Sequence, residues 1–317
     1  MEIILRAVAI SAVVYNHAHV YGPPSVTFAG GMTVLMLLSG VSFARFALTT
    51  GSAGKIRAAA FNLAKLLLLP SMAVLVFSFF YMRQFSLTEL LFVSNWFKGD
   101  YIARFPIWYP EVMIQMMVIV AVMFSIPPLL RVFLRYPLVA SIAVLALAVL
   151  VRFLMPAWHD TSGLYHRLPH LFLWNFVLGW VVFYVSAGDR PLLLKAVVIA
   201  GALASGIVGW DPGGPQGWWL AVAVGLLLFL PNVRLPSPLV QPVTIVSQAS
   251  FAIFLLHTIA LGAYRAIFPW ESPEIAFVFA MLGCVVFWIV LTSFLRAWRE
   301  TRKSFATGGE AIAAQPW

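Results

Sequence analysis

Long apolar runs separated by short polar segments fill almost the whole chain. Ten of these runs are long enough, or nearly so, to cross about 30 Å of hydrocarbon as helices. Pro and Gly mark the loops between them. We therefore predict an all-α integral membrane protein, with a single bundle of about ten transmembrane helices over residues 1–296 and a disordered cytoplasmic tail at 297–317. The predicted spans are residues 3–21, 28–48, 59–82, 107–127, 137–155, 168–186, 192–210, 215–231, 244–267 and 274–296.

The composition supports a membrane protein and excludes a soluble globular domain. Of the 317 residues, 62% are hydrophobic and 10% are charged, whereas soluble domains have about 45–50% apolar and about 25% charged residues. The net charge of +9 could suggest nucleic acid, but the basic residues are scattered between apolar runs and form no basic face. We therefore predict membrane lipids, and no nucleic acid, as partners.

Neither the cysteine count nor the histidine spacing predicts a metal site. The one cysteine, Cys284, lies in an apolar run, so a disulfide framework and a cysteine-based metal site are excluded. A loop at 159–170 is rich in His and Asp, but its spacing fits no zinc pattern. We interpret this loop as a solvated segment or an acceptor-binding surface and predict no metal.

The distribution of Lys and Arg predicts how the bundle is inserted. With the N-terminus inside, fourteen Lys and Arg residues fall on the inner side and six on the outer side. Cytoplasmic loops carry the excess of basic residues, so we predict that both termini are cytoplasmic. The first run starts without a basic segment or a cleavage site, which predicts a retained helix and not a signal peptide.

Ionisable residues at membrane depth are costly and are therefore candidate functional residues. Arg6 and His17 are eleven residues apart, which is three helical turns plus about 20°, so they share one face about 16 Å apart along the axis. That face carries a cation near the cytoplasm and an imidazole in the outer half. The alternative is that Arg6 anchors the helix at the inner surface and that His17 forms a hydrogen bond between helices.

Further polar groups are predicted at the depth of His17. Glu111 and Gln115 share a helical face four residues apart, and Glu111 reaches a level similar to His17. His257 lies about 20 Å up the ninth predicted span. We predict that His17, Glu111 and His257 meet in the outer half of the bundle. The alternatives are that Glu111 faces the headgroups at a helix N-terminus and that His257 forms an interhelical hydrogen bond.

Cations gather at the predicted cytoplasmic ends of the first three spans. Together they could receive a polyphosphate, although each alone could be an anchor that snorkels to the interface. In the second span, Ser39-Gly40 favours close helix packing or a kink that opens a cavity. In the loop at 83–106, the apolar stretch from Leu87 to Trp96 is too short to span and is predicted to be re-entrant or interfacial. The cations are Arg6, Arg45, Lys55, Arg57 and Lys65.

Four elements, in order along the chain, resemble the membrane acyltransferase-3 family. Arg6 to His17 resembles its Arg-x10-His element, and Leu37-Leu38-Ser39-Gly40 is similar to its FFxLSG element. Trp108-Tyr109-Pro110-Glu111 resembles its WYxxE element. The stretch from Ser247 to His257 is similar to its S-x-x-S-Y-x-I-Y-L-x-H ending. The resemblance implies a ten-helix enzyme of the stand-alone form, in a bacterial cytoplasmic (inner) membrane.

The resemblance further implies transfer of an acyl group, often acetyl, from cytoplasmic acyl-CoA to a hydroxyl of a carbohydrate or glycosylated acceptor. Acyl-CoA is then a co-substrate, and no permanently bound cofactor is predicted. We predict that His17 is the general base or a transient acyl carrier, with Glu111 orienting or charge-balancing it. Arg6, Arg45 and Lys65 are predicted to bind the donor, although Lys65 only partly replaces the family's Arg-x-x-Arg element. The predicted substrate-binding residues are Ser39, Trp108, Gln115 and His257.

A transporter or flippase is the alternative from another functional class. In such a protein His17, Glu111 and His257 would form a proton relay across a cavity. Transporters often contain inverted repeats with interrupted helices, and the two halves of this chain show no such correspondence. A purely structural role gives little reason to place arginine and histidine on one helical face at lipid depth.

Overall fold

The computed structural model describes residues 1–18, 30–83, 85–97, 107–154, 167–188, 190–208, 216–268 and 272–313. All regular structure in these ranges is helical. Its elements are α1 (Glu2–Ala18), α2 (Gly31–Phe46), η2 (Leu48–Thr50), α3 (Ala53–Met82), α4 (Leu87–Leu90), η3 (Ser94–Trp96), α5 (Trp108–Met123), α6 (Pro127–Arg135), α7 (Pro137–Leu154), α8 (Pro169–Ser186), α9 (Leu192–Val208), α10 (Gln216–Phe229), α11 (Ser237–Ile267) and α12 (Pro273–Ala313).

Every predicted span coincides with a helix, but fewer than ten helices have the length and composition to cross a bilayer. Among the described residues six helices qualify, or seven if α5 and α6, bent by 92° at their junction, form one span. The described residues of α1 and α9 number 17 each, and those of α10 number 14. At about 1.5 Å per residue, these described residues alone cover less than the roughly 30 Å of hydrocarbon. The all-helical membrane class is confirmed, and the number ten is not.

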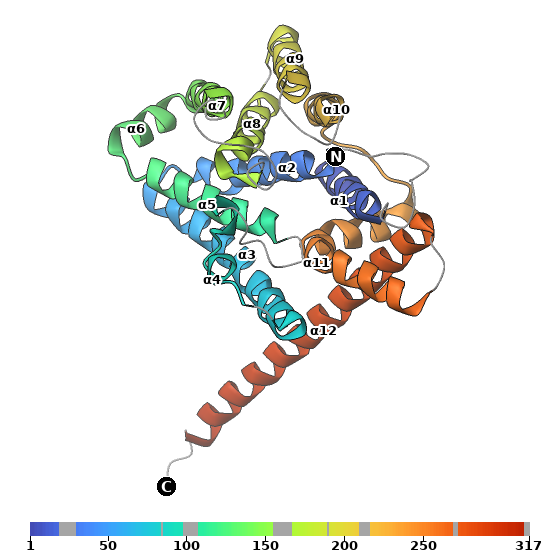
Figure 1. Cartoon of the computed structure of the whole chain (residues 1–317). Helices are drawn as coiled ribbons and strands as arrows, with labels where there is room; N and C mark the ends of the chain where they lie inside the picture. Colours follow the sequence, from blue (N-terminus) through green and yellow to red (C-terminus); the bar gives the residue numbers. More distant parts are fainter. Residues whose placement is uncertain are drawn as a thin grey trace.

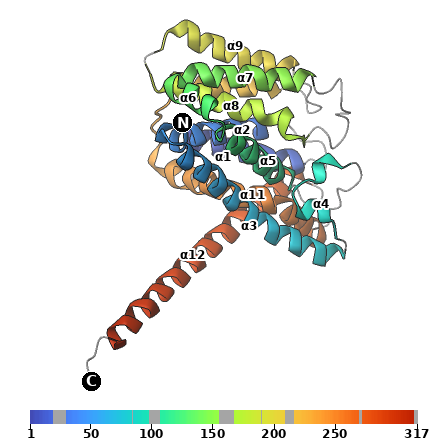
Figure 2. The same cartoon turned by 90° about the vertical axis from the view of Figure 1, so that its left-hand side faces the viewer.

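The last helix extends beyond its predicted end at residue 296. It begins at Pro273 and continues to Ala313. Residues 297–313, which were predicted to be disordered, are therefore helical. Its buried positions are Pro273, Ala276, Ala280 and Cys284, which lie on one face three or four residues apart. From residue 285 to residue 300 the helix has no buried position, and it projects from the bundle in Figures 1 and 2.

The bundle is organised around α2, which is its most buried helix. In the membrane-crossing window of α2, 72% of the residues are buried, compared with 17% for α7. Figure 2 shows α9 and α7 on one side of α8 and α2, with α1 and α11 on the other side. An ion pair between Glu2 and Arg45 joins the start of α1 to the end of α2. The helices α1 and α2 are therefore antiparallel neighbours.

Two glycines allow α2 and α8 to approach each other closely. A Cβ atom on Gly40 would lie 1.8 Å from the backbone oxygen of Phe176, and one on Gly179 would lie 2.3 Å from the backbone oxygen of Leu37. Helix association in membranes depends on such small residues. Because α2 is one continuous helix through Ser39-Gly40, this segment serves close packing and does not break the helix.

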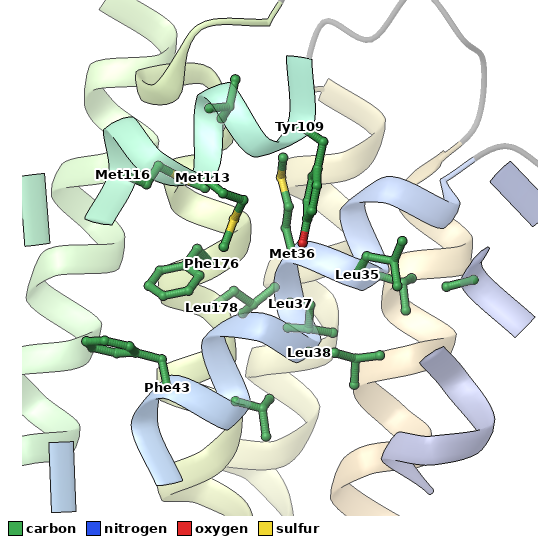
Figure 3. Close-up of a cluster of buried hydrophobic side chains, with 14 of the residues drawn as sticks. Leu35, Met36, Leu37, Leu38, Phe43, Tyr109, Met113, Met116, Phe176 and Leu178 are labelled. Carbon is green, nitrogen blue, oxygen red and sulfur yellow. The ribbon is translucent and has the colours of Figure 1, made fainter. Parts of the chain in front are cut away.

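Apolar side chains fill the space around this crossing. Figure 3 shows α2 contributing Leu37 and Phe43, α8 contributing Phe176, and α5 contributing Met113. All four side chains are at least 95% buried. This dense core fixes the positions of α1, α2, α5 and α8, and the polar residues described below lie on these helices and on α11.

Candidate active site

The two histidines predicted to meet are in direct contact. Nε2 of His257 lies 3.2 Å from Nδ1 of His17, and the ring centroids are 4.9 Å apart. His17 lies in the last turn of α1 and is half-buried, whereas His257 lies within α11 and is completely buried. The packing of α1 along α11 brings together two residues that are 240 positions apart.

Glu111 forms its hydrogen bonds away from this pair, so its predicted role of orienting or charge-balancing His17 stays a prediction. Its carboxylate accepts hydrogen bonds from the Ser94 hydroxyl at 3.0 and 3.1 Å and from the Asn95 backbone N–H at 3.2 Å. Among the described residues, Glu111 is hydrogen-bonded to neither histidine. The physical reason is local, because η3 packs over the first turn of α5 and supplies donors to a completely buried carboxylate. That burial also rules out the headgroup alternative.

Gln115 extends the same network one turn further along α5. Its amide nitrogen donates to the backbone oxygen of Phe92 at 2.7 Å and to Oδ1 of Asn95 at 2.9 Å. Its amide oxygen accepts a hydrogen bond from the Trp96 indole at 3.1 Å. Glu111 and Gln115 do share a face, as predicted, and that face holds the segment from Phe92 to Trp96. Gln115 therefore attaches the segment around η3 to α5, and its predicted role in substrate binding stays a prediction.

Ser39 meets Tyr109, a residue that the sequence did not single out. The Ser39 hydroxyl donates to the backbone oxygen of Leu35 at 2.8 Å, and its oxygen lies 3.2 Å from the Tyr109 hydroxyl. Because the only Ser39 hydroxyl proton points to Leu35, Tyr109 is the donor to Ser39. Figure 3 shows the Tyr109 hydroxyl reaching from α5 to α2. The Tyr109 ring packs on Phe254, 5.1 Å between centroids, and Phe254 lies 5.8 Å from the His257 ring.

Arg6 approaches α2 one helical turn away from Ser39. Its Nη2 atom lies 3.5 Å from the Ser42 hydroxyl, and Ser42 follows Ser39 by three residues, on the same helical face. Arg6 is half-buried, and among the described residues it forms no ion pair. A line of polar and aromatic groups therefore runs from Arg6 through Ser42, Ser39 and Tyr109 toward the histidine pair.

The other two predicted donor-binding cations lie outside this line. Arg45 is engaged by Glu2 and borders a cavity of about 300 Å³ that is also lined by Ser186 and Asn232. Lys65 lies on the exposed side of α3, and in the described part of the chain it forms no ion pair. Arg6 is the predicted cation that the structure places beside the interior polar groups.

Trp108 is a packing residue at the start of α5. It is 9% exposed, its ring lies 5.5 Å from Phe172, and the Arg167 guanidinium lies over it at 5.3 Å. Most of the histidine-rich loop, residues 159–166, lies outside the described residues. Among the described residues, no cluster of three or more His, Cys, Asp or Glu side chains could hold a metal ion.

The residues that sequence reasoning missed are Ser42, Tyr109, Ser94 and Asn95. Ser42 could have been found, because it lies three residues from Ser39 in an apolar helix and so shares its face. Tyr109 sits inside the motif that supplied Trp108 and Glu111, but nothing in the spacing shows which motif residue faces α2. Ser94 and Asn95 belong to a segment that folds back onto α5. This is a tertiary contact, and no local sequence pattern indicates it.

A comparison with models of known protein families finds one family that matches nearly the whole chain. A family model described as an acyltransferase domain, that of the acyltransferase-3 family, matches residues 3–294. The matched range includes Arg6, Ser39, Tyr109, His17 and His257. No curated protein and no solved structure matches the chain. The chain therefore belongs to the acyltransferase-3 family, and this membership implies membrane O-acyltransferase activity.

Proposed function

We propose that the protein transfers an acyl group, preferentially acetyl, from cytoplasmic acyl-CoA to a hydroxyl of a carbohydrate or glycosylated acceptor. The observation that carries the proposal is the line of contacts from Arg6 to the histidine pair. A thioester donor with phosphate groups needs a cation for its phosphates, and a hydroxyl acceptor needs a base. Arg6 and His17 supply these groups about 16 Å apart along α1, a distance that a pantetheine arm can cover.

His17 acts in this proposal as the general base, in its neutral form. The acceptor oxygen attacks the thioester carbonyl carbon while a His17 ring nitrogen takes the hydroxyl proton. The carbon–sulfur bond then breaks, and the same nitrogen returns the proton to the departing thiolate. The products are an ester and free CoA thiol. Ser39 and Tyr109 border the route of the donor arm between the two ends.

We further infer ten spans, a domain covering residues 1–296, and a bacterial inner membrane with both termini cytoplasmic. Counting α5 with α6 as one span, the helices α1, α9 and α10, each of which coincides with a predicted span, complete the number ten. The fourteen-to-six division of basic residues supports the orientation, and Glu2 and Arg45, at opposite ends of consecutive helices, lie on one side as alternating spans require.

The decisive experiment combines the purified protein with its cellular product. We expect purified protein to release thiol from acetyl-CoA when an acceptor glycan extract is added, and we expect intact-mass spectra of cell-surface glycans to gain one acetyl group only when the protein is present. His17→Ala should reduce both signals to a small residual level, whereas Lys65→Ala should preserve them. Absence of acyl transfer by correctly folded wild-type protein would contradict the proposal.

The position of Glu111 does not support the alternative of a transporter with a proton relay. Its relay requires His17, Glu111 and His257 to exchange protons, but Glu111 is held by Ser94 and Asn95. Uptake of a labelled solute by vesicles that contain the protein and lack acyl-CoA would favour transport over transfer.

A further inference from the structure

We propose that His257 is a positioning residue that fixes the tautomer and orientation of His17, in the place that a carboxylate takes in a Ser-His-Asp triad. The inference deepens the proposed function and rests on it, because it concerns the residue proposed as the base. It is carried by hydrogen-bond geometry: the two imidazoles contact each other, and the Nδ1 atom of each lies within hydrogen-bond distance of a backbone carbonyl of its own helix.

The helix backbone of α11 determines which nitrogen of His257 carries the proton. Nδ1 lies 2.6 Å from the backbone oxygen of Phe254 and 3.1 Å from that of Ile253. Carbonyl oxygens only accept hydrogen bonds, so Nδ1 must be the protonated nitrogen, and Nε2 of the neutral ring carries a lone pair. A second proton would leave a completely buried cation without a carboxylate among its hydrogen-bond partners, which is costly at membrane depth.

The same argument then applies to His17. Its Nδ1 lies 2.9 Å from the backbone oxygen of Val13 and 3.2 Å from Nε2 of His257. Both neighbours are acceptors, so Nδ1 of His17 carries a proton and donates it to them. The opposite assignment would point a lone pair of His17 at Val13 and a lone pair of His257 at Phe254. In its neutral form, His17 therefore has its lone pair on Nε2.

This arrangement prepares Nε2 of His17 to act as the base. When Nε2 takes the acceptor proton, the ring becomes an imidazolium, and its Nδ1–H bond to His257 becomes charge-assisted and stronger. Burial on α11 and two carbonyl contacts keep the His257 ring in place, so it holds the base in one orientation. His257 thus fills the orienting role that the sequence assigned to Glu111.

The tautomer itself is the first test, and it needs no substitution. We would label the histidine nitrogens with ¹⁵N in the full-length protein in lipid nanodiscs and assign His17 from the spectrum of His17→Ala. We expect His17 to be protonated at Nδ1 and unprotonated at Nε2 in its neutral form. A His17 signal with the proton on Nε2 would overturn the proposal.

Substitutions of His257 provide the second test. His257→Leu removes the acceptor, and we expect kcat to fall about 10- to 100-fold, by analogy with the loss on removing a partner that orients a metal-binding histidine. His257→Gln can offer its amide oxygen to Nδ1 of His17 and should recover most of that loss. An equal loss in both variants would show that position 257 is needed only for packing.

The double variant separates positioning from general damage to the fold. If His257 acts only through His17, adding His257→Leu to His17→Ala should leave the residual rate unchanged, because residues that act as one unit are not additive. A further loss in the double variant would contradict the inference. Inactive wild-type protein would instead refute the proposed function, and the tautomer measurement would still decide the geometry.

Discussion

The hydroxyl of Tyr109 donates a hydrogen bond to the hydroxyl of Ser39 at 3.2 Å, and this contact joins α5 to α2. Both residues lie between Arg6 and the histidine pair. The Tyr109 side chain is 93% buried, so its hydroxyl depends on Ser39. Removing the Ser39 hydroxyl and removing the Tyr109 hydroxyl should therefore reduce the stability of the protein by different amounts.

We predict that Ser39→Ala destabilises the protein more than Tyr109→Phe. The alanine leaves a buried hydroxyl without its acceptor, which costs about 1–3 kcal/mol. The phenylalanine keeps the ring on Phe254 and leaves Ser39 bonded to Leu35, so its cost is about 1 kcal/mol. Thermal unfolding in detergent measures both. The double variant should be no less stable than Ser39→Ala alone, and fully additive losses would show that the two hydroxyls are not partners.

Arg6 and Lys65 test which cation binds the donor. Arg6→Gln should raise KM for acetyl-CoA about 10- to 100-fold with little change in kcat, because a charge-assisted hydrogen bond to a phosphate contributes about 1.5–3 kcal/mol. Lys65→Gln, on the exposed side of α3, is the matched control and should behave as wild type. Steady-state kinetics over a range of acetyl-CoA concentrations provide the measurement. A large KM effect at Lys65 and none at Arg6 would reverse the assignment.

Glu111 should behave as a structural residue and not as part of the base. Glu111→Ala leaves the Ser94 hydroxyl and the Asn95 N–H buried without their acceptor. We therefore expect the free energy of local unfolding of residues 92–97 to fall by about 2–3 kcal/mol. Hydrogen exchange of this segment, followed by mass spectrometry, should become faster. The ¹⁵N signals of His17 should not change. Unchanged hydrogen exchange together with altered His17 signals would instead support a direct pairing of Glu111 with His17.

The sequence predicted the helices and the face that joins Arg6 to His17 because both depend on local periodicity. It also placed His257 at the depth of His17, since a position along a helix converts directly into a height. Depth alone, however, does not say which helices are neighbours. The same conversion predicts a similar depth for Glu111, yet residues of η3 cover its carboxylate. No sequence pattern before α5 indicates that cover. The distinction between His257 and Glu111 is therefore a result of tertiary packing.

The count of spans shows the same limit. Composition predicted ten apolar runs, but it does not predict where a helix ends within a run. The predicted span at 107–127 shows this, because α5 ends at Met123 and α6 begins at Pro127, bent by 92° from α5. Hydropathy sets the class of a segment, whereas helix ends and bends depend on prolines, caps and contacts with neighbouring helices.

The crossing of α2 and α8 should be the most sensitive packing position in the bundle. Gly179→Ala places a methyl group against backbone atoms of Leu37 and Gly40, which cannot move aside, so α8 must separate from α2 and the protein should lose at least about 3 kcal/mol of stability or fail to fold. Gly201→Ala in α9 is the control, since no atom lies within 4 Å of its added carbon. Alanine has the higher helix propensity, so this variant should unfold at or above the wild-type temperature in detergent. Equal behaviour of the two variants would show that α2 and α8 are not in backbone contact.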